Sequence, residues 1–187
     1  MPYRLTKIYT RKGDQGYTTL GDNRLSKDDF LVEAIGTIDE LNSVIGFVIS
    51  LQIQHKDIAD YLTQIQNELF DMGGELHAPE HSVINAEKVS VIEQKLDTWN
   101  KTLPPLKEFL LPRGNPKSAA CHVARTVCRR AERCLVRLHR QVPLNNTELL
   151  RYLNRLSDLL FVVARMLGNE TDEKELLWAH EKQQKNK

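Results

Sequence analysis

Apolar residues recur at intervals of three and four along most of the chain, which is the spacing of amphipathic helices. The series Ala34, Ile38, Leu41 and Ile45 is one example. Because each such segment has one apolar face to bury, the pattern predicts an all-α fold, a bundle of five helices. The predicted helices cover residues 27–54, 57–77, 86–101, 118–141 and 147–167.

The breaks between these segments carry start and stop signals. Asn85 is suited to cap the third predicted helix, and Gly168 with Asn169 is suited to end the fifth. Between the third and fourth helices, the stretch TLPPLKEFLLPRGNPK holds four prolines and a glycine, which exclude a continuous helix. The one strand signal is at residues 7–10. We therefore predict a single domain over 1–187, with an N-terminal loop at 1–26, the bundle at 27–168 and a polar C-terminal tail at 169–187.

The N-terminal stretch KIYTRKGDQGYTTLGDNRLSKDD holds three glycines and five basic residues, but few side chains that could join a core. Gly13 and Gly16 would let a ligand approach the backbone closely, and Lys12 and Lys27 supply positive charge. The pattern matches neither the P-loop nor the dinucleotide-binding motif. It is typical of a phosphate cradle, with an ordinary flexible arm as the alternative. The threonines that could add hydroxyl and N–H groups are Thr10, Thr18 and Thr19.

One face of the fourth predicted helix is charged rather than apolar. Arg125, Arg129, Glu132 and Arg133 stand at i, i+4, i+7 and i+8, and so share one stripe. Every basic residue in this arginine stripe is arginine, whose planar guanidinium can bind phosphate oxygens at two points. The stripe therefore indicates an anion-binding surface. The alternative is a solvated face held by local ion pairs.

Two other helices carry polar residues that allow two interpretations. Asn154, Asp158 and Arg165 fall on one stripe of the fifth predicted helix, which is either an internal hydrogen-bond network or one wall of a binding site. Asp39, beside Glu40 in the first predicted helix, is either surface charge or an acidic partner for an arginine of the fourth. The residues alone leave both choices open.

Composition and charge narrow the functional class. A formal net charge of +1 disfavours a nucleic-acid-binding protein, and no apolar run approaches the roughly 20 residues of a membrane span. Three cysteines, an odd number, argue against a disulfide framework and for a reducing compartment. The N-terminus lacks the pattern of a signal peptide, so we expect a cytoplasmic protein, with a processed organellar form as the alternative.

Several kinds of catalytic centre are not predicted. The sequence contains no Glu-x-x-His pair, which a di-metal carboxylate bundle needs. Cys121, Cys128 and Cys134 lack the spacing of a zinc site, and His122 is interpreted as a structural histidine. No nucleophile with a neighbouring base and acid is visible, and no protein-held metal site is predicted.

Four stretches together closely resemble the PduO-type ATP:cob(I)alamin adenosyltransferases: KIYTRKGDQGYTT at the N-terminus, EAIGTIDELNSVIGF at 33–47, RTVCRRAER at 125–133 and NRLSDLLFVVAR at 154–165. The resemblance spans residues 7–168, in the family's order and spacing. It implies a five-helix bundle that assembles as a homotrimer with ATP between subunits. The implied reaction is attack of cob(I)alamin on the 5′-carbon of ATP, with Mg²⁺ present, to give adenosylcobalamin and triphosphate. Cob(I)alamin is itself a strong nucleophile, so this reaction needs no catalytic base.

The resemblance also assigns roles to individual residues. Phe109 corresponds to the aromatic residue that closes on the lower face of the corrin ring, and Asp39 with Arg125 to a salt bridge across the subunit interface. The chain departs from the family pattern at residues 113–117 and at Cys121, where glycine-rich small residues and leucine are usual. The implied ATP-binding residues are Thr10, Arg11, Lys12, Gly13, Thr18, Thr19 and Lys27 in the loop, Arg129, Arg130, Glu132 and Arg133 in the fourth helix, and Asn154 in the fifth.

The same resemblance implies partners. Cob(II)alamin must be reduced before it can react, so we expect an electron-transfer flavoprotein reductase as donor and an adenosylcobalamin-dependent enzyme as acceptor of the product. No nucleic acid or membrane partner is expected. The alternative from a different class is a non-catalytic helical protein that binds ATP or cobalamin, a sensor or a carrier. Such a protein would share the loop and the arginine stripe but would transfer nothing.

Overall fold

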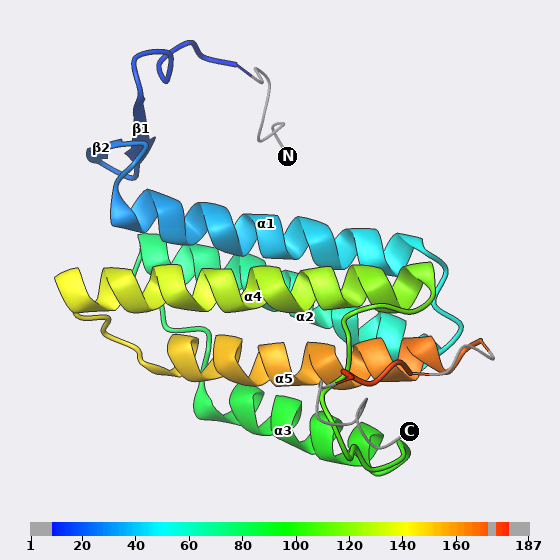
Figure 1. Cartoon of the computed structure of the whole chain (residues 1–187). Coiled ribbons are helices and arrows are strands. Elements are labelled where there is room, and N and C mark those ends of the chain that lie inside the picture. Colours follow the sequence, from blue (N-terminus) through cyan, green and yellow to red (C-terminus); the bar gives the residue numbers. More distant parts are fainter. Residues whose placement is uncertain (1–8, 172–174, 180–187) are drawn as a thin grey trace, which may run out of the picture.

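The computed structural model describes residues 9–171 and 175–179. Within these residues the predicted all-α bundle of five helices is confirmed, with a small two-stranded sheet before it (Figure 1). The predicted helix at 118–141 begins two residues earlier, because Asn115 caps it and Pro116 occupies its first turn. The helices are α1 (Phe30–Ser50), α2 (Lys56–His77), α3 (Ala86–Asn100), α4 (Pro116–Gln141) and α5 (Glu148–Gly168).

The ends of the helices follow local capping chemistry. The side chain of Asp29 accepts a hydrogen bond of 2.8 Å from the Leu31 N–H, so α1 begins at Phe30 and not at the predicted residue 27. It ends at Ser50 rather than 54, since Gln52 has a positive φ of 59°. The Asn85 cap of α3 and the stop of α5 after Gly168 are both confirmed.

The helices share one hydrophobic core, and α4 lies between α1 and α5 (Figure 1). α2 packs on α1 and α3 packs on α5. Two buried thiols help to join the central pair, because Cys121 and Cys128 each donate a hydrogen bond of 3.3 Å to a carbonyl oxygen of α5. One side of α4 is left outside the core, and the arginine stripe lies on it. None of the helices in the described residues is long and apolar enough to cross a membrane.

A β-hairpin precedes α1 and was not predicted. Strands β1 (Tyr17–Leu20) and β2 (Asn23–Ser26) pair antiparallel, with Thr18 opposite Leu25. The turn between them begins at Gly21, whose positive φ of 54° suits a two-residue hairpin. The strand signal at residues 7–10 was wrong for Tyr9 and Thr10, which are in no strand, while residues 7 and 8 lie outside the described residues. The Gly-Asp turn between two short runs was the signal that could have revealed the hairpin.

The proline-rich segment between α3 and α4 contains no helix, as predicted, but it has a partner from the end of the chain. The Leu111 N–H donates a 2.9 Å hydrogen bond to the Leu176 carbonyl, and the Trp178 N–H donates a 2.7 Å bond to the Phe109 carbonyl. These bonds flank an antiparallel bridge between Leu110 and Leu177. We call residues 109–111 and 176–178 the terminal ladder. Of the predicted polar tail at 169–187, residues 172–174 and 180–187 lie outside the described residues.

Candidate active site

The arginine stripe lies on the outer side of α4 at the middle of its length. Arg129, Arg130 and Arg133 are exposed, and Nη1 of Arg133 donates a 2.9 Å hydrogen bond to the Arg129 carbonyl. Within the described part of the chain, the Arg129 guanidinium has no hydrogen bond or ion pair, so its donors are available to an anion. The helix therefore presents a concentration of positive charge over little more than one turn.

Two of the predicted site residues meet directly across α4 and α5. Nδ2 of Asn154 donates a 3.1 Å hydrogen bond to Oε1 of Glu132, and Oδ1 of Asn154 accepts a 3.3 Å bond from Arg155. The structure thus brings Asn154 next to the arginine stripe. Arg165 does not belong to this group, although it shares the sequence stripe with Asn154, because it is buried in a separate network near the end of α5.

An acidic residue of α1 does contact an arginine of α4, but this residue is not Asp39. It is Glu40 that forms an ion pair with Arg130 of α4. Asp39 is exposed, and its carboxylate has no hydrogen bond or ion pair within the described residues. Within the described residues Asp39 therefore pairs with no arginine of its own chain, and its pairing with Arg125 of another subunit stays a prediction.

Arg125 is the one half-buried arginine of the stripe. Its Nε atom is buried without a hydrogen-bond partner, and its guanidinium lies 6.0 Å from the centre of the Phe161 ring. Burial lowers the pKa of Arg125, and the neighbouring charge of Arg129 lowers that pKa further. A half-buried cation without a counter-charge is still costly, so a carboxylate brought in from outside the chain would stabilise it.

An apolar cavity of about 590 Å³ lies beneath the segment that carries Phe109, and its lining includes His122, Arg125 and Phe161. The Phe109 side chain itself is 74% exposed. A second cavity of about 280 Å³ shares Arg125 and Phe161 with the first and extends to Arg129. The apolar cavity beside Phe109 is therefore adjacent to the arginine stripe.

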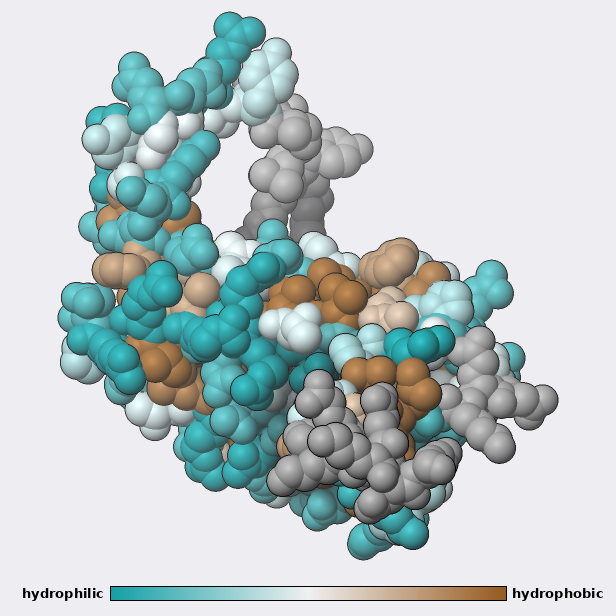
Figure 2. All heavy atoms as spheres, viewed as in Figure 1, coloured by the Kyte–Doolittle hydropathy of each residue, from teal (hydrophilic) through white to brown (hydrophobic). Residues whose placement is uncertain are grey.

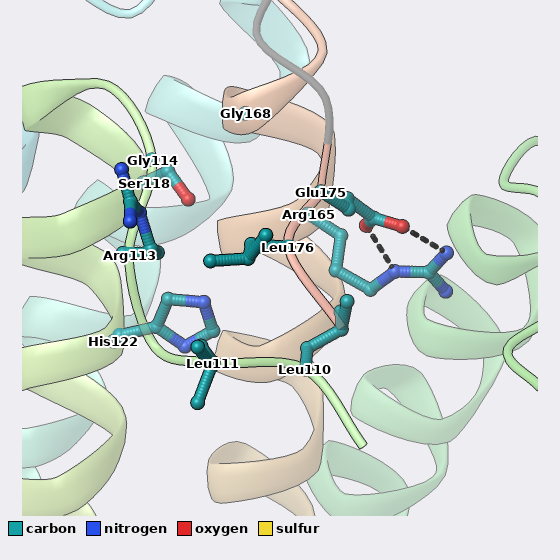
Figure 3. A pocket seen from close by; sticks show the side chains of 10 residues that line it. All are labelled: Leu110, Leu111, Arg113, Gly114, Ser118, His122, Arg165, Gly168, Glu175 and Leu176. Carbon is teal, nitrogen blue, oxygen red and sulfur yellow. Dashed lines mark hydrogen bonds and ion pairs between the residues drawn. The ribbon is translucent and has the colours of Figure 1, made fainter. Parts of the chain in front are cut away.

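His122 lies between this cavity and a third one of about 420 Å³, which Figure 3 shows. The imidazole is almost fully buried, and its Nδ1 atom has no hydrogen-bond partner. Burial, reinforced by the positive charge of Arg125, lowers the pKa of His122 to about 4, so the ring is neutral at pH 7. In the described residues no group of three or more His, Cys, Asp or Glu side chains could hold a metal ion.

Residues 9–26, the described part of the N-terminal loop with its hairpin, project from the bundle and are largely covered by hydrophilic side chains (Figures 1 and 2). A Cβ atom at Gly13 would lie only 3.1 Å from Nζ of Lys27, so the lysine amine lies over the glycine backbone. The Lys27 N–H donates a 2.8 Å hydrogen bond to the Gly16 carbonyl, and Arg11 has a positive φ of 59°. Thr18 is half-buried on β1, and the remaining predicted loop residues Thr10, Lys12 and Thr19 are exposed.

Within residues 9–171 and 175–179, the loop and the Phe109 segment do not come together in one chain. The base of the hairpin shares a cavity with Leu138 and Val142, at the C-terminal end of α4. Phe109 precedes the N-terminal end of the same helix, which has 26 residues and is about 39 Å long. The predicted site residues of a single subunit are therefore spread along the length of α4.

Comparison with known proteins identifies the group to which the chain belongs. The sequence model described as cobalamin adenosyltransferase matches residues 8–167. The chain belongs to this family. A cobalamin adenosyltransferase of Cupriavidus metallidurans is 45% identical, covering 98% of this chain and all of the relative. A corrinoid adenosyltransferase of Bacillus subtilis is 43% identical, covering 87% of this chain and 86% of the relative.

Solved structures agree with this assignment. A variant PduO-type ATP:corrinoid adenosyltransferase from Lactobacillus reuteri, complexed with cobalamin and ATP, superposes with a TM-score of 0.86 at 37% identity. The match covers 92% of this chain and 96% of that one. A second variant of the same enzyme, complexed with ATP, has a TM-score of 0.85 at 36% identity. The predicted fold and family of this adenosyltransferase are thus confirmed.

Three features of this adenosyltransferase were missed from its sequence: the Glu40–Arg130 ion pair, the terminal ladder and the network around Arg165. Glu40 stands next to Asp39, and the helical pattern gave no reason to prefer either carboxylate. The ladder joins segments far apart in the sequence, and its strands are too short to show a periodic pattern.

Proposed function

We propose that this chain transfers the 5′-deoxyadenosyl group of ATP to cob(I)alamin, releasing triphosphate, and that it works as a homotrimer with ATP bound between subunits. The observation that carries the proposal is that the apolar cavity near Phe109 lies next to the arginine stripe, because Arg125 and Phe161 line both this cavity and the one that reaches Arg129. One substrate has a large corrin ring with a largely apolar face, and the other carries a triphosphate. The two adjoining surfaces offer matching chemistry.

The proposed trimer is supported by the incomplete site of a single subunit. The hairpin and the Phe109 segment lie towards opposite ends of α4, so a loop from a neighbouring subunit could complete the site beside the arginine stripe. Arg125 has a buried nitrogen without a partner, and Asp39 is exposed. Their pairing between subunits would supply the missing counter-charge.

The chemistry needs positive charge and positioning rather than a base. Cob(I)alamin provides the nucleophile, its electron pair forms the cobalt–carbon bond, and the bond from the 5′-carbon to the triphosphate oxygen breaks. Negative charge then accumulates on the triphosphate. Arg129, Arg130 and Arg133, with Lys12 and Lys27 of the neighbouring loop, would bind it through donors already in place. Holding the 5′-carbon in line with cobalt supplies the remaining rate enhancement.

Mg²⁺ fits this site as a companion of the nucleotide. The described residues offer no cage of acidic side chains, and Mg²⁺ commonly takes its ligands from phosphates, waters and one or two carboxylates. Glu132 is the carboxylate within the arginine stripe, and its Oε1 already accepts a hydrogen bond from Asn154. The ion would neutralise part of the phosphate charge.

Phe109 would act before the transfer step. Cob(II)alamin with an axial ligand is hard to reduce, and an apolar side chain that excludes the lower ligand leaves cobalt four-coordinate and easier to reduce. The exposed Phe109 ring at the mouth of the apolar cavity is suited to this role. A one-electron donor, such as a flavoprotein reductase, and an adenosylcobalamin-dependent acceptor would complete the sequence in the reducing cytoplasm.

The transfer is tested by mixing the purified protein anaerobically with ATP, Mg²⁺ and chemically reduced cob(I)alamin, and following the visible spectrum. We expect the cob(I) band to disappear as a light-sensitive alkylcobalamin spectrum grows, in an ATP-dependent manner. Omitting ATP is the control. If ATP binds but the cob(I) spectrum persists, the protein is a binder rather than an adenosyltransferase.

The subunit interface is tested by Asp39→Ala, with Glu40→Ala as a matched control. Removing Asp39 leaves Arg125 without its predicted partner, so we expect each interface to weaken by about 2 kcal/mol or more. Glu40 pairs with Arg130 in its own chain, and its removal should leave the assembly unchanged. Sedimentation over a range of concentrations measures the effect. An Asp39→Ala trimer as stable as the unmodified one would mean that Arg125 finds its counter-charge elsewhere.

A further inference from the structure

A single buried arginine binds both segments that lead to the terminal ladder. Arg165 of α5 is 4% exposed. Its Nε and Nη2 atoms donate hydrogen bonds of 2.6 and 3.2 Å to the two carboxylate oxygens of Glu175 (Figure 3). Nη2 also donates a 2.7 Å bond to the Pro104 carbonyl. One guanidinium thus connects α5 to the start of the proline-rich segment and to the C-terminal segment.

These two segments are the ones that support Phe109. Pro104 begins the stretch that leads to Phe109, and Glu175 immediately precedes the ladder residues 176–178. In the ladder, the Phe109 carbonyl accepts the 2.7 Å hydrogen bond from the Trp178 N–H. The Phe109 and Trp178 rings pack edge to face with their centres 6.2 Å apart. Anything that holds Pro104 and Glu175 in place therefore restrains the Phe109 backbone from both sides.

We propose that Arg165 is a positioning residue, which sets the place of Phe109 by clamping Pro104 and Glu175 together. The proposal rests on the proposed function, in which Phe109 excludes the lower ligand of cobalt. Phe109 is mostly exposed and cannot be held by burial, and an irregular segment without a helix has many alternative conformations. The clamp removes that freedom before the corrin arrives, so the binding energy of the corrin is not used to order the segment.

The partners of these hydrogen bonds distinguish a positioning role of Arg165 from a role in stabilising the helical bundle. Within the described residues, all three hydrogen bonds that the Arg165 side chain donates end on the two loop segments, and none ends on a helix of the bundle. Its loss should release these segments while the helical core, which is formed by apolar contacts, persists. Glu175 is partly exposed, with 23% of its side chain accessible, so water can solvate its carboxylate when the arginine is removed.

The test compares Arg165→Met with the unmodified protein, using the electron paramagnetic resonance spectrum of bound cob(II)alamin in the presence of ATP. This spectrum distinguishes four-coordinate from five-coordinate cobalt. Methionine keeps the apolar length of the side chain and removes the charge-assisted bonds, so we expect the four-coordinate population to fall about tenfold or more. ATP affinity and transfer from chemically reduced cob(I)alamin should change by less than about threefold. Glu175→Gln, a milder change, should shift the spectrum in the same direction.

A disulfide across the ladder provides the rescue. Leu110 and Leu177 oppose each other between the two ladder hydrogen bonds, the kind of antiparallel pair whose Cα atoms are about 4.5 Å apart, within the range of a disulfide. Adding Leu110→Cys and Leu177→Cys to Arg165→Met should restore the four-coordinate signal when the disulfide is formed and lose it again on reduction. The same cysteine pair with Arg165 intact is the control. A purely structural role of Arg165 would not produce this dependence on the disulfide.

Phe109→Ala in the same measurement separates the role of Phe109 from the role of the Arg165 clamp. If Phe109→Ala loses the four-coordinate signal while Arg165→Met and Glu175→Gln keep it, the clamp is overturned and the role of Phe109 stands. If Phe109→Ala keeps the signal, the role of Phe109 is overturned, and the clamp loses its purpose with it.

Discussion

Replacing Phe109 with alanine is expected to reduce turnover of cob(II)alamin with a physiological reductant by at least about tenfold, while ATP binding is retained. The ring is 74% exposed beside the apolar cavity, so its removal costs the bundle little but lets water or another ligand reach the lower face of cobalt. Cob(II)alamin then keeps its axial ligand and is harder to reduce. Steady-state turnover with cob(II)alamin, compared with turnover of cob(I)alamin reduced beforehand, measures the effect.

The matched control is Phe70→Ala. Phe70 is 71% exposed on α2, so the two substitutions remove similar rings from similarly exposed positions. We expect Phe70→Ala to leave both reactions unchanged. The comparison between the two cobalt states then locates the defect, because Phe109→Ala should impair the reaction from cob(II)alamin more than the reaction from cob(I)alamin. Equal loss in both reactions would place Phe109 in corrin binding rather than in exclusion of the lower ligand.

Arg129→Ala is expected to slow adenosyl transfer from cob(I)alamin by about a hundredfold, which is the effect of removing one donor aimed at developing charge. The Arg129 guanidinium has no partner within the described residues, so its removal breaks no contact that stabilises the fold. In the complex it would bind the triphosphate oxygens as charge accumulates on them. Single-turnover kinetics at saturating ATP separate this step from ATP affinity.

Two further substitutions test whether the planar guanidinium of Arg129 causes this effect on the rate. Arg129→Lys keeps the charge but loses the planar fork, and we expect it to recover only part of the rate. Arg151→Ala is the control, because Arg151 is an exposed arginine of α5 whose ion pair is with Glu148 on its own helix. It should change neither rate nor affinity. If Arg129→Ala reacts like the unmodified protein, the arginine stripe is a solvated face and the triphosphate is bound elsewhere.

The helices could be predicted because their signals are local. The apolar spacing of α1, the Asn85 cap of α3 and the stop after Gly168 each depend on residues within a few turns of one another. The arginine stripe was visible for the same reason, since helical periodicity alone places Arg125, Arg129 and Arg133 on one face. Four short segments, three in helices and one in the N-terminal loop, resembled the family closely enough to identify it.

What the sequence could not decide depends on contacts between distant segments. Helical periodicity groups Asn154 with Arg165, but packing separates them, placing one beside Glu132 and burying the other against Pro104 and Glu175. Helical periodicity also gives no reason to prefer Asp39 or Glu40 as an arginine partner. Only the position of α4 beside α1 makes Glu40 the partner of Arg130.

The amino-acid sequence by itself thus determined five amphipathic helices, a charged stripe and a glycine-rich basic loop, because each is encoded by neighbouring residues. The tertiary structure alone decided that residues 176–178 pair with the Phe109 segment and that Arg165 hydrogen-bonds to Pro104 and Glu175, which lead to the two paired segments. It also placed the apolar cavity next to the arginine stripe. These arrangements depend on contacts between segments far apart in the sequence, which no local pattern specifies.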